Sequence, residues 1–99
     1  MIDRVKIGPI SYTIEEVSNL RNTEGTWLYG EINYHEFVIR LSEDNTHESR
    51  FVTLWHETLH AIETAYGLEL SEDEVTALAT AIAQVLQDNP GLNWTDHNA

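Results

Sequence analysis

Hydrophobic and polar residues alternate along the first part of the chain. The alternation runs through residues 4–7 and, after Gly8-Pro9, resumes through residues 10–15, with Val17 as an extension. Two further β-rich segments, residues 27–33 and 37–41, are separated by a three-residue polar link. A period of two is typical of strands with one face in water, and so short a link is typical of a hairpin. These residues predict a small antiparallel sheet of about three strands.

The period of the pattern changes to 3.6 after about residue 46. Apolar residues recur at spacings of three and four between residues 52 and 66, and Gly67 follows where a helix would stop. Ser71 then stands as an N-cap before three acidic residues, and a second apolar stripe covers residues 75–86. Strands followed by two packed helices predict an α+β fold.

The length of the chain, 99 residues, is that of one small domain. Residues 92–99 have no hydrophobic period, so we expect a single domain over residues 1–91 and a C-terminal tail over residues 92–99. Gly30 lies inside a predicted strand. A glycine there indicates a bulge or a close approach of another group to the backbone.

Acidic residues outnumber basic residues by seventeen to five, which gives a formal net charge of −12. So few Lys and Arg residues argue against direct binding to nucleic acid and against an anionic membrane surface. The chain has no cysteine, which excludes disulfides, thiolate metal sites and thiol nucleophiles. No apolar run approaches the length of a membrane span, and a cytoplasmic location is the expectation.

The strongest chemical signal is an HExxH motif, residues 56–60, in the middle of the first predicted helix. His56 and His60 lie one turn apart on one helix face, so both can reach a single metal ion. Glu57 lies beside this pair, where it can accept a proton from a water that the metal polarises. The histidines flank the apolar stripe, at the edge of a cleft. The pattern predicts a zinc site with Glu57 as the catalytic base.

Two histidines leave a zinc ion in need of a third protein ligand. Glu63 lies one turn beyond His60, too far along a straight helix for the same ion, which favours a carboxylate that is solvated or that contacts a ligand. Glu72 opens the second predicted helix on the face that points toward the first. Glu74 lies three residues after Ser71, where a capping-box glutamate is expected. The residues favour Glu72 and leave Glu74 open.

Residues 28–90 resemble the small phage-associated zinc metallopeptidase-like proteins that are related to the ImmA/IrrE family and the minigluzincins. The resemblance is carried by the segments YGEINY, FVIRL, TLWHETLHAI and LSEDEVTALATAIAQVLQDNP. In ImmA/IrrE-type sequences the third ligand is a glutamate followed three and seven residues later by small or apolar residues. Glu72 is followed in this way by Val75 and Ala79, which favours Glu72 independently.

The resemblance implies a minimal zincin-like fold that hydrolyses a peptide bond in a peptide or protein substrate. The zinc ligands would be His56, His60 and Glu72, with Glu57 as general base. Such folds place an exposed strand along the cleft for an extended peptide to pair with, here expected at residues 37–41.

The resemblance also includes latent proteins in which the C-terminal tail covers the metal. Asp96 and His97 are the candidate ligands for such self-blocking in this chain.

Two other classes of function stay open. The charge of −12 also fits an acidic interaction module that mimics nucleic acid and binds a basic protein, although the acidic residues are scattered rather than in rows. Glu57 and His60 form a Glu-x-x-His pair of the kind found in di-iron helix bundles, but a second pair is absent.

Overall fold

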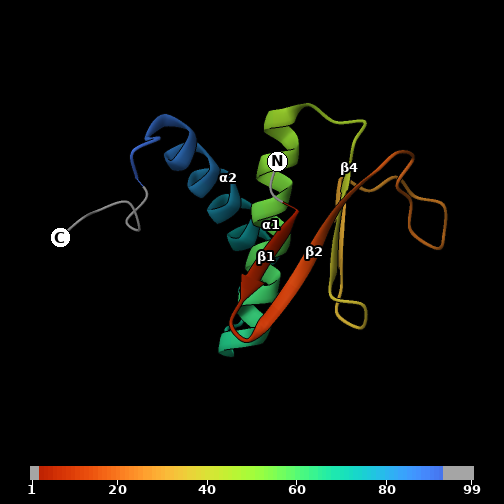
Figure 1. The fold of residues 1–99 in the computed structure, drawn as a ribbon, viewed down its shortest axis with the longest axis horizontal. Helices are drawn as coiled ribbons and strands as arrows, with labels where there is room; N and C mark the ends of the chain where they lie inside the picture. Colours follow the sequence, from red (N-terminus) through yellow and green to blue (C-terminus); the bar gives the residue numbers. More distant parts are fainter. Residues whose placement is uncertain (1–2, 93–99) are drawn as a thin grey trace.

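The computed structural model describes residues 3–92. Its order of elements is β1 (Arg4–Ile7), β2 (Ile10–Val17), β3 (Gly30–Asn33), β4 (Val38–Ser42), α1 (His47–Tyr66) and α2 (Glu72–Asp88) (Figure 1). The predicted α+β class is therefore confirmed. Neither helix in this part of the chain is long and apolar enough to cross a membrane.

The sheet has four strands and is mixed, so the expectation of about three antiparallel strands was wrong. Its strand order is β1-β2-β4-β3. The outer pairs β1–β2 and β3–β4 are antiparallel, whereas the central strands β2 and β4 are parallel, with Thr13 beside Val38 and Val17 beside Ser42. The long connection between β2 and β3 causes the difference. It lets the β3–β4 hairpin lie with β3 outermost and β4 against β2.

β4 is an inner strand, which corrects the expectation of an exposed strand at residues 37–41. Val38, Ile39 and Leu41 are all buried, and β4 is paired on both sides, with β2 and with β3. A nearly continuous apolar run is typical of such a strand, and FVIRL is one. Among the described residues the edges of the sheet are β1 and β3.

α1 begins and ends as its sequence predicts. The side chain of Thr46 caps the helix by accepting a hydrogen bond from the amide of Ser49. Gly67 follows the last turn with φ +70°, a left-handed conformation that glycine adopts readily, and its amide donates to the carbonyl of Glu63.

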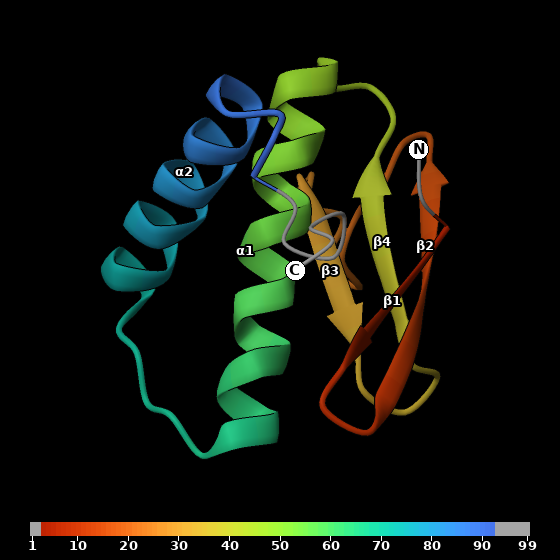
Figure 2. The same ribbon diagram turned by 60° about the vertical axis from the view of Figure 1, so that its left-hand side comes forward.

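α1 lies between the sheet and α2, and both of its broad faces are packed (Figure 2). Leu54 and Ala61 face the sheet and belong to a buried cluster with Ile7, Tyr12, Ile14, Ile39 and Leu41. The predicted apolar stripe faces α2 instead, where Val52, Trp55, Leu59 and Ile62 pack around Val75 and Ala79. Tyr66, the last member of that stripe, is exposed.

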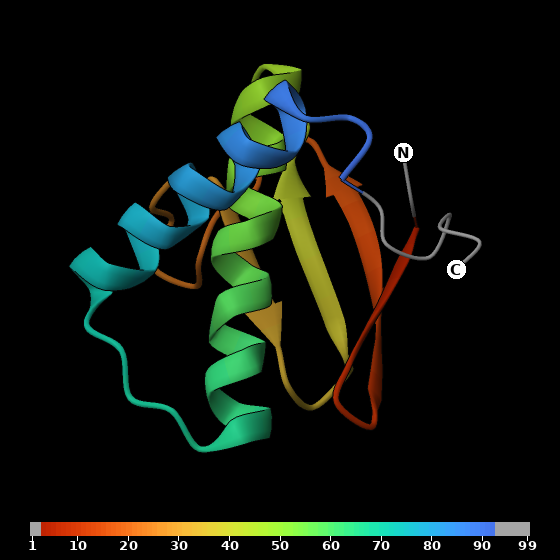
Figure 3. The same ribbon diagram turned by 90° about the vertical axis from the view of Figure 1, so that its left-hand side faces the viewer.

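α2 begins at a complete capping box. Ser71 accepts a hydrogen bond from the amide of Glu74, and the Glu74 carboxylate accepts one from the amide of Ser71. The helix runs back obliquely along α1 (Figure 3). Within residues 3–92 it packs on α1 and not on the sheet. Leu78 and Val85, expected on its buried face, are partly exposed.

Gly30 marks a close approach of α1 to β3, which is one of the two roles expected for it. A Cβ atom built on Gly30 would lie 2.5 Å from the side chain of Thr53 and 3.0 Å from the carbonyl of Arg40. A real side chain cannot occupy that space without a shift. The glycine therefore allows the edge strand to lie against α1 one helical turn before the HExxH motif.

Candidate metal centre

The HExxH motif lies on the flank of α1 between its two packed faces. Each residue of a helix turns the side chain by about 100°. Leu54 faces the sheet and Leu59 faces α2, and on this period His56 and His60 fall between them. The sequence therefore places both imidazoles at a boundary, supported by packing on either side and partly open to solvent.

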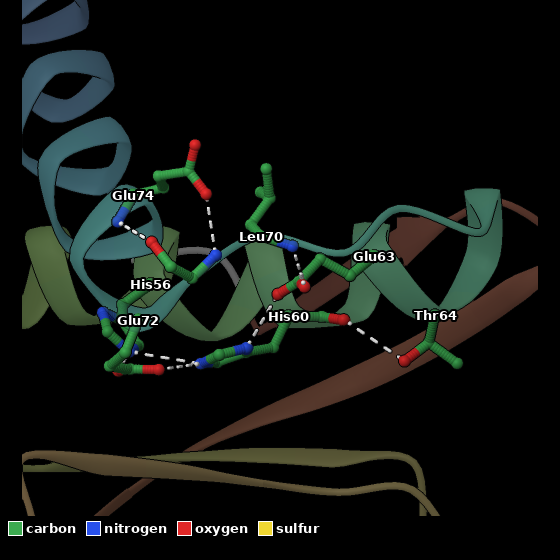
Figure 4. Close-up of polar contacts among 8 residues, drawn as sticks. His56, His60, Glu63, Thr64, Leu70, Glu72 and Glu74 are labelled. Atoms are coloured by element: carbon green, nitrogen blue, oxygen red, sulfur yellow. Dashed lines mark hydrogen bonds and ion pairs between the residues drawn. The ribbon is translucent and has the colours of Figure 1, made fainter.

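Three potential ligands meet at this boundary. His56 and His60 come from α1, and Glu72 is the first residue of α2 (Figure 4). One ligand atom from each lies within 4.8 Å of the others. Glu72 Oε1 is 2.8 Å from His56 Nε2, Glu72 Oε2 is 3.5 Å from His60 Nε2, and the two Nε2 atoms are 3.3 Å apart. The structure thus brings together the three residues predicted as ligands.

The distance between the two histidine nitrogens fits a small tetrahedral ion. Zinc binds histidine nitrogen at about 2.0–2.1 Å, so two tetrahedral ligands should lie about 3.3–3.4 Å apart. The Nε2–Nε2 distance of 3.3 Å has this value. Two imidazoles and a carboxylate are also a donor set that zinc accepts, with a fourth position left for solvent. The Glu72 side chain is 68% exposed, so solvent can reach the cluster.

Glu74, the rival candidate for the third ligand, is engaged elsewhere. Its carboxylate lies 2.8 Å from the Ser71 amide as part of the capping box. Figure 4 shows it pointing away from the two histidines, toward the start of α2. The cap therefore lies in the same first turn of α2 that carries Glu72.

Glu57 is the buried acid of the site, with 8% of its surface exposed. Burial raises the pKa of its carboxyl above the ordinary glutamate value, while the neighbouring His56 and His60 act in the opposite direction. Nearby Glu72 and Glu31 add to the increase. A carboxylate of raised pKa beside two imidazoles is a stronger proton acceptor than a solvated one.

Glu63 is not one of the three residues that meet, in agreement with its position too far along the helix. Of the two roles considered for it, the structure has the one that contacts a ligand. Its Oε1 lies 3.0 Å from His60 Nδ1 and its Oε2 accepts a 2.9 Å hydrogen bond from the amide of Leu70 (Figure 4). The hydrogen bond from Leu70, together with His60, lowers the pKa of this carboxyl.

No sequence pattern indicates the Leu70 contact, because the donor is a backbone amide in an irregular connection. The predicted ligands of the tail, Asp96 and His97, lie outside the described residues. The edge strand beside α1 is β3. The nearly continuous apolar run FVIRL could have indicated this, because such a run is typical of an inner strand and would have placed β4 in the interior of the sheet.

Comparison with known proteins leaves the site to be interpreted from its own geometry. No protein-family model matches the chain, and no curated protein or solved structure matches it either.

Proposed function

We propose that this chain binds one zinc ion through His56, His60 and Glu72 and is a metallopeptidase-like protein that hydrolyses peptide bonds. The observation that carries the proposal is the meeting of these three side chains, from two helices, with the two histidine nitrogens at a spacing suited to zinc. Zinc held there would supply Lewis-acid activation of a water molecule and of a substrate carbonyl.

Glu57 is the general base in this proposal. Its carboxylate is buried next to the two histidines, with its pKa raised by that burial. A base of this kind takes a proton from water at the site and returns it to the departing amine. Glu57 lies between the two histidines in the sequence, but its side chain is buried and is not among the three that meet. We therefore do not assign it as a ligand.

The substrate would be an extended segment of a peptide or protein. β3 is an edge strand and contacts α1 beside the motif. An extended peptide can add to such an edge through backbone hydrogen bonds, which makes β3 the strand to which we assign substrate binding. This assignment replaces the strand at residues 37–41.

The first test is the metal content of the protein, purified without an affinity tag or chelator, by elemental analysis. We expect one zinc per chain, and loss of that zinc in Glu72→Ala. Glu74→Gln is the matched control because it alters a carboxylate two residues away that has no place among the ligands. A chain without zinc that is not stabilised by added zinc, or an equal loss in both variants, would contradict the proposed site.

The second test separates metal binding from catalysis. Glu57→Gln should keep the zinc and lower the rate of hydrolysis of fluorescently labelled casein, an unstructured protein, by about 10²- to 10⁴-fold. Hydrolysis at the native rate by this variant would show that Glu57 is not the base. Zinc binding without hydrolysis in the wild type would leave a metal-binding protein that is not a peptidase.

A second candidate function is an acidic module that binds a basic protein. It is favoured by one observation: all five Lys and Arg residues precede residue 51, so residues 51–99 contain Asp and Glu but no Lys or Arg. A complex with a basic protein that survives removal of metal by EDTA would support this alternative.

A further inference from the structure

We propose that Glu63 is a positioning residue that links His60 to the connection between the two helices, and so brings the zinc ligands of α1 and α2 together. The inference rests on the proposed zinc site and adds a fourth residue to it. Glu63 does not itself approach the ion. Its two carboxylate oxygens are divided between the two elements that must meet, one on His60 and one on Leu70.

The first contact selects the form of His60 that can bind metal. The Leu70 amide already donates to Oε2, so Oε1 is the carboxylate oxygen that faces His60, and a carboxylate oxygen accepts hydrogen bonds. The Nδ1 of His60, 3.0 Å from Oε1, must then carry the proton and donate it. A neutral imidazole protonated on Nδ1 has its lone pair on Nε2, the atom that faces His56 and Glu72.

The second contact fixes the chain just before Glu72. Leu70 is two residues before that ligand, and its amide donates to Glu63 Oε2 at 2.9 Å. Leu70 is part of an irregular connection, residues 67–71, in which Gly67 and Leu68 donate to the last turn of α1 and Ser71 to the capping box of α2. The contact with Glu63 holds the backbone between these two ends. The carboxylate is well placed for this role because its side chain is only 16% exposed.

The two contacts matter together because α2 is otherwise held by α1 alone. Among the described residues, α2 makes no contact with the sheet. Its first residue can therefore reach the histidines only if the connection and the α1–α2 packing direct it there. Glu63 is the side chain that contacts both the ligand on one helix and the connection that leads to the other.

Glu63→Gln tests whether the two contacts of Glu63 matter, and it changes the size of the side chain little. A glutamine has one accepting oxygen and one donating nitrogen, so it cannot accept from both His60 and Leu70. If its oxygen stays on Leu70, its amide group donates to Nδ1 of His60 and favours the imidazole form with the proton on Nε2. We expect zinc affinity, measured by competition with a chromogenic chelator, to fall about 10- to 100-fold.

Glu69→Gln is the matched control. Glu69 is an exposed residue of the same connection, one position before Leu70, and the change removes the same charge. We expect its zinc affinity to equal that of the wild type. Equal affinity for the Glu63 and Glu69 variants would overturn the role of Glu63 while leaving the zinc site intact. Absence of zinc binding in the wild type would overturn the site and, with it, this role.

NMR supplies two readouts that activity does not. In the metal-free protein, the Leu70 amide should exchange with solvent faster in Glu63→Gln than in Glu69→Gln. In the zinc-loaded wild type, the Nδ1 proton of His60 should be protected by its hydrogen bond. That second measurement needs no variant, so it decides the case even if Glu63→Gln does not fold: an unprotected Nδ1 proton would overturn the proposal.

Discussion

The two faces of α1 are held in different ways. On the sheet side, the helix closes a cluster of seven buried residues in which Ile39 and Leu41 are fully covered. On the α2 side, the buried cluster is Leu59, Val75 and Ala79, surrounded by partly buried side chains. Since apolar burial contributes about 25 cal/mol per Å², the smaller side chains of the second interface contribute less to stability.

On the α2 side, polar contacts lie beside the small apolar cluster. His56 and His60 approach Glu72, and Glu63 approaches Leu70, all across the α1–α2 boundary. A polar contact as exposed as that of Glu72 with His56 contributes little by itself. A bound metal that joins the same residues would contribute much more. If zinc binds as proposed, the α2 side of α1 should therefore depend on the metal, whereas the sheet side, which has no candidate ligand, should not.

The largest effect should come from the sheet side. Leu41→Ala removes a fully buried side chain of β4 and leaves a cavity, so we expect the free energy of unfolding to fall by about 2–5 kcal/mol. The loss should be the same in EDTA and in zinc, because β4 has no ligand. Urea unfolding followed by circular dichroism measures both values.

Leu78→Ala is the control for that variant, with the same chemical change on the exposed side of α2. We expect a change within about 0.5 kcal/mol. A zinc-dependent loss in Leu41→Ala, or equal losses at the two positions, would contradict the contrast between the faces.

The next effect should come from the metal. Zinc at a free concentration of 100 Kd should raise the free energy of unfolding by about 2.7 kcal/mol, and His60→Ala should abolish the increase. Amide hydrogen exchange should slow more in α2 than in β4, because α2 carries the proposed ligand Glu72 and β4 carries none. Equal slowing in both elements would show that α2 and the sheet form one cooperative unit, and the contrast would fail.

Short-range sequence patterns made the two helices and the three candidate ligands predictable. The cap at Ser71, the stop at Gly67 and the HExxH spacing act within a few residues, so the sequence contains them directly. The choice of Glu72 over Glu74 followed from the same local rule, because a capping box occupies Glu74. In the structure Glu72 lies next to the two histidines. Its position on the face of α2 that points toward α1 had indicated this.

Features that depend on distant parts of the chain were harder to predict. The parallel pairing of β2 with β4 is set by the path of residues 18–29, which no local pattern encodes. The predicted stripe of α1 is packed from Val52 to Ile62, but its partner is α2, and a second face with Leu54 and Ala61 meets the sheet. The contact of Glu63 with Leu70 depends on the shape of the interhelix connection.

The smallest effect should separate the two helix caps. Thr46→Ala and Ser71→Ala each remove a side chain that accepts a hydrogen bond from the first turn of its helix. Each should lower the free energy of unfolding by about 1 kcal/mol.

Only Ser71→Ala should also weaken zinc binding, since Ser71 precedes Glu72 and its cap orients the first turn of α2. Thr46 lies ten residues before His56, at the far end of α1. Zinc titrations of the two variants, compared at equal losses of stability, measure the difference. If both variants bind zinc as the wild type does, the orientation of Glu72 is fixed by the α1–α2 packing and by Glu63, and the cap stabilises the helix without serving the site.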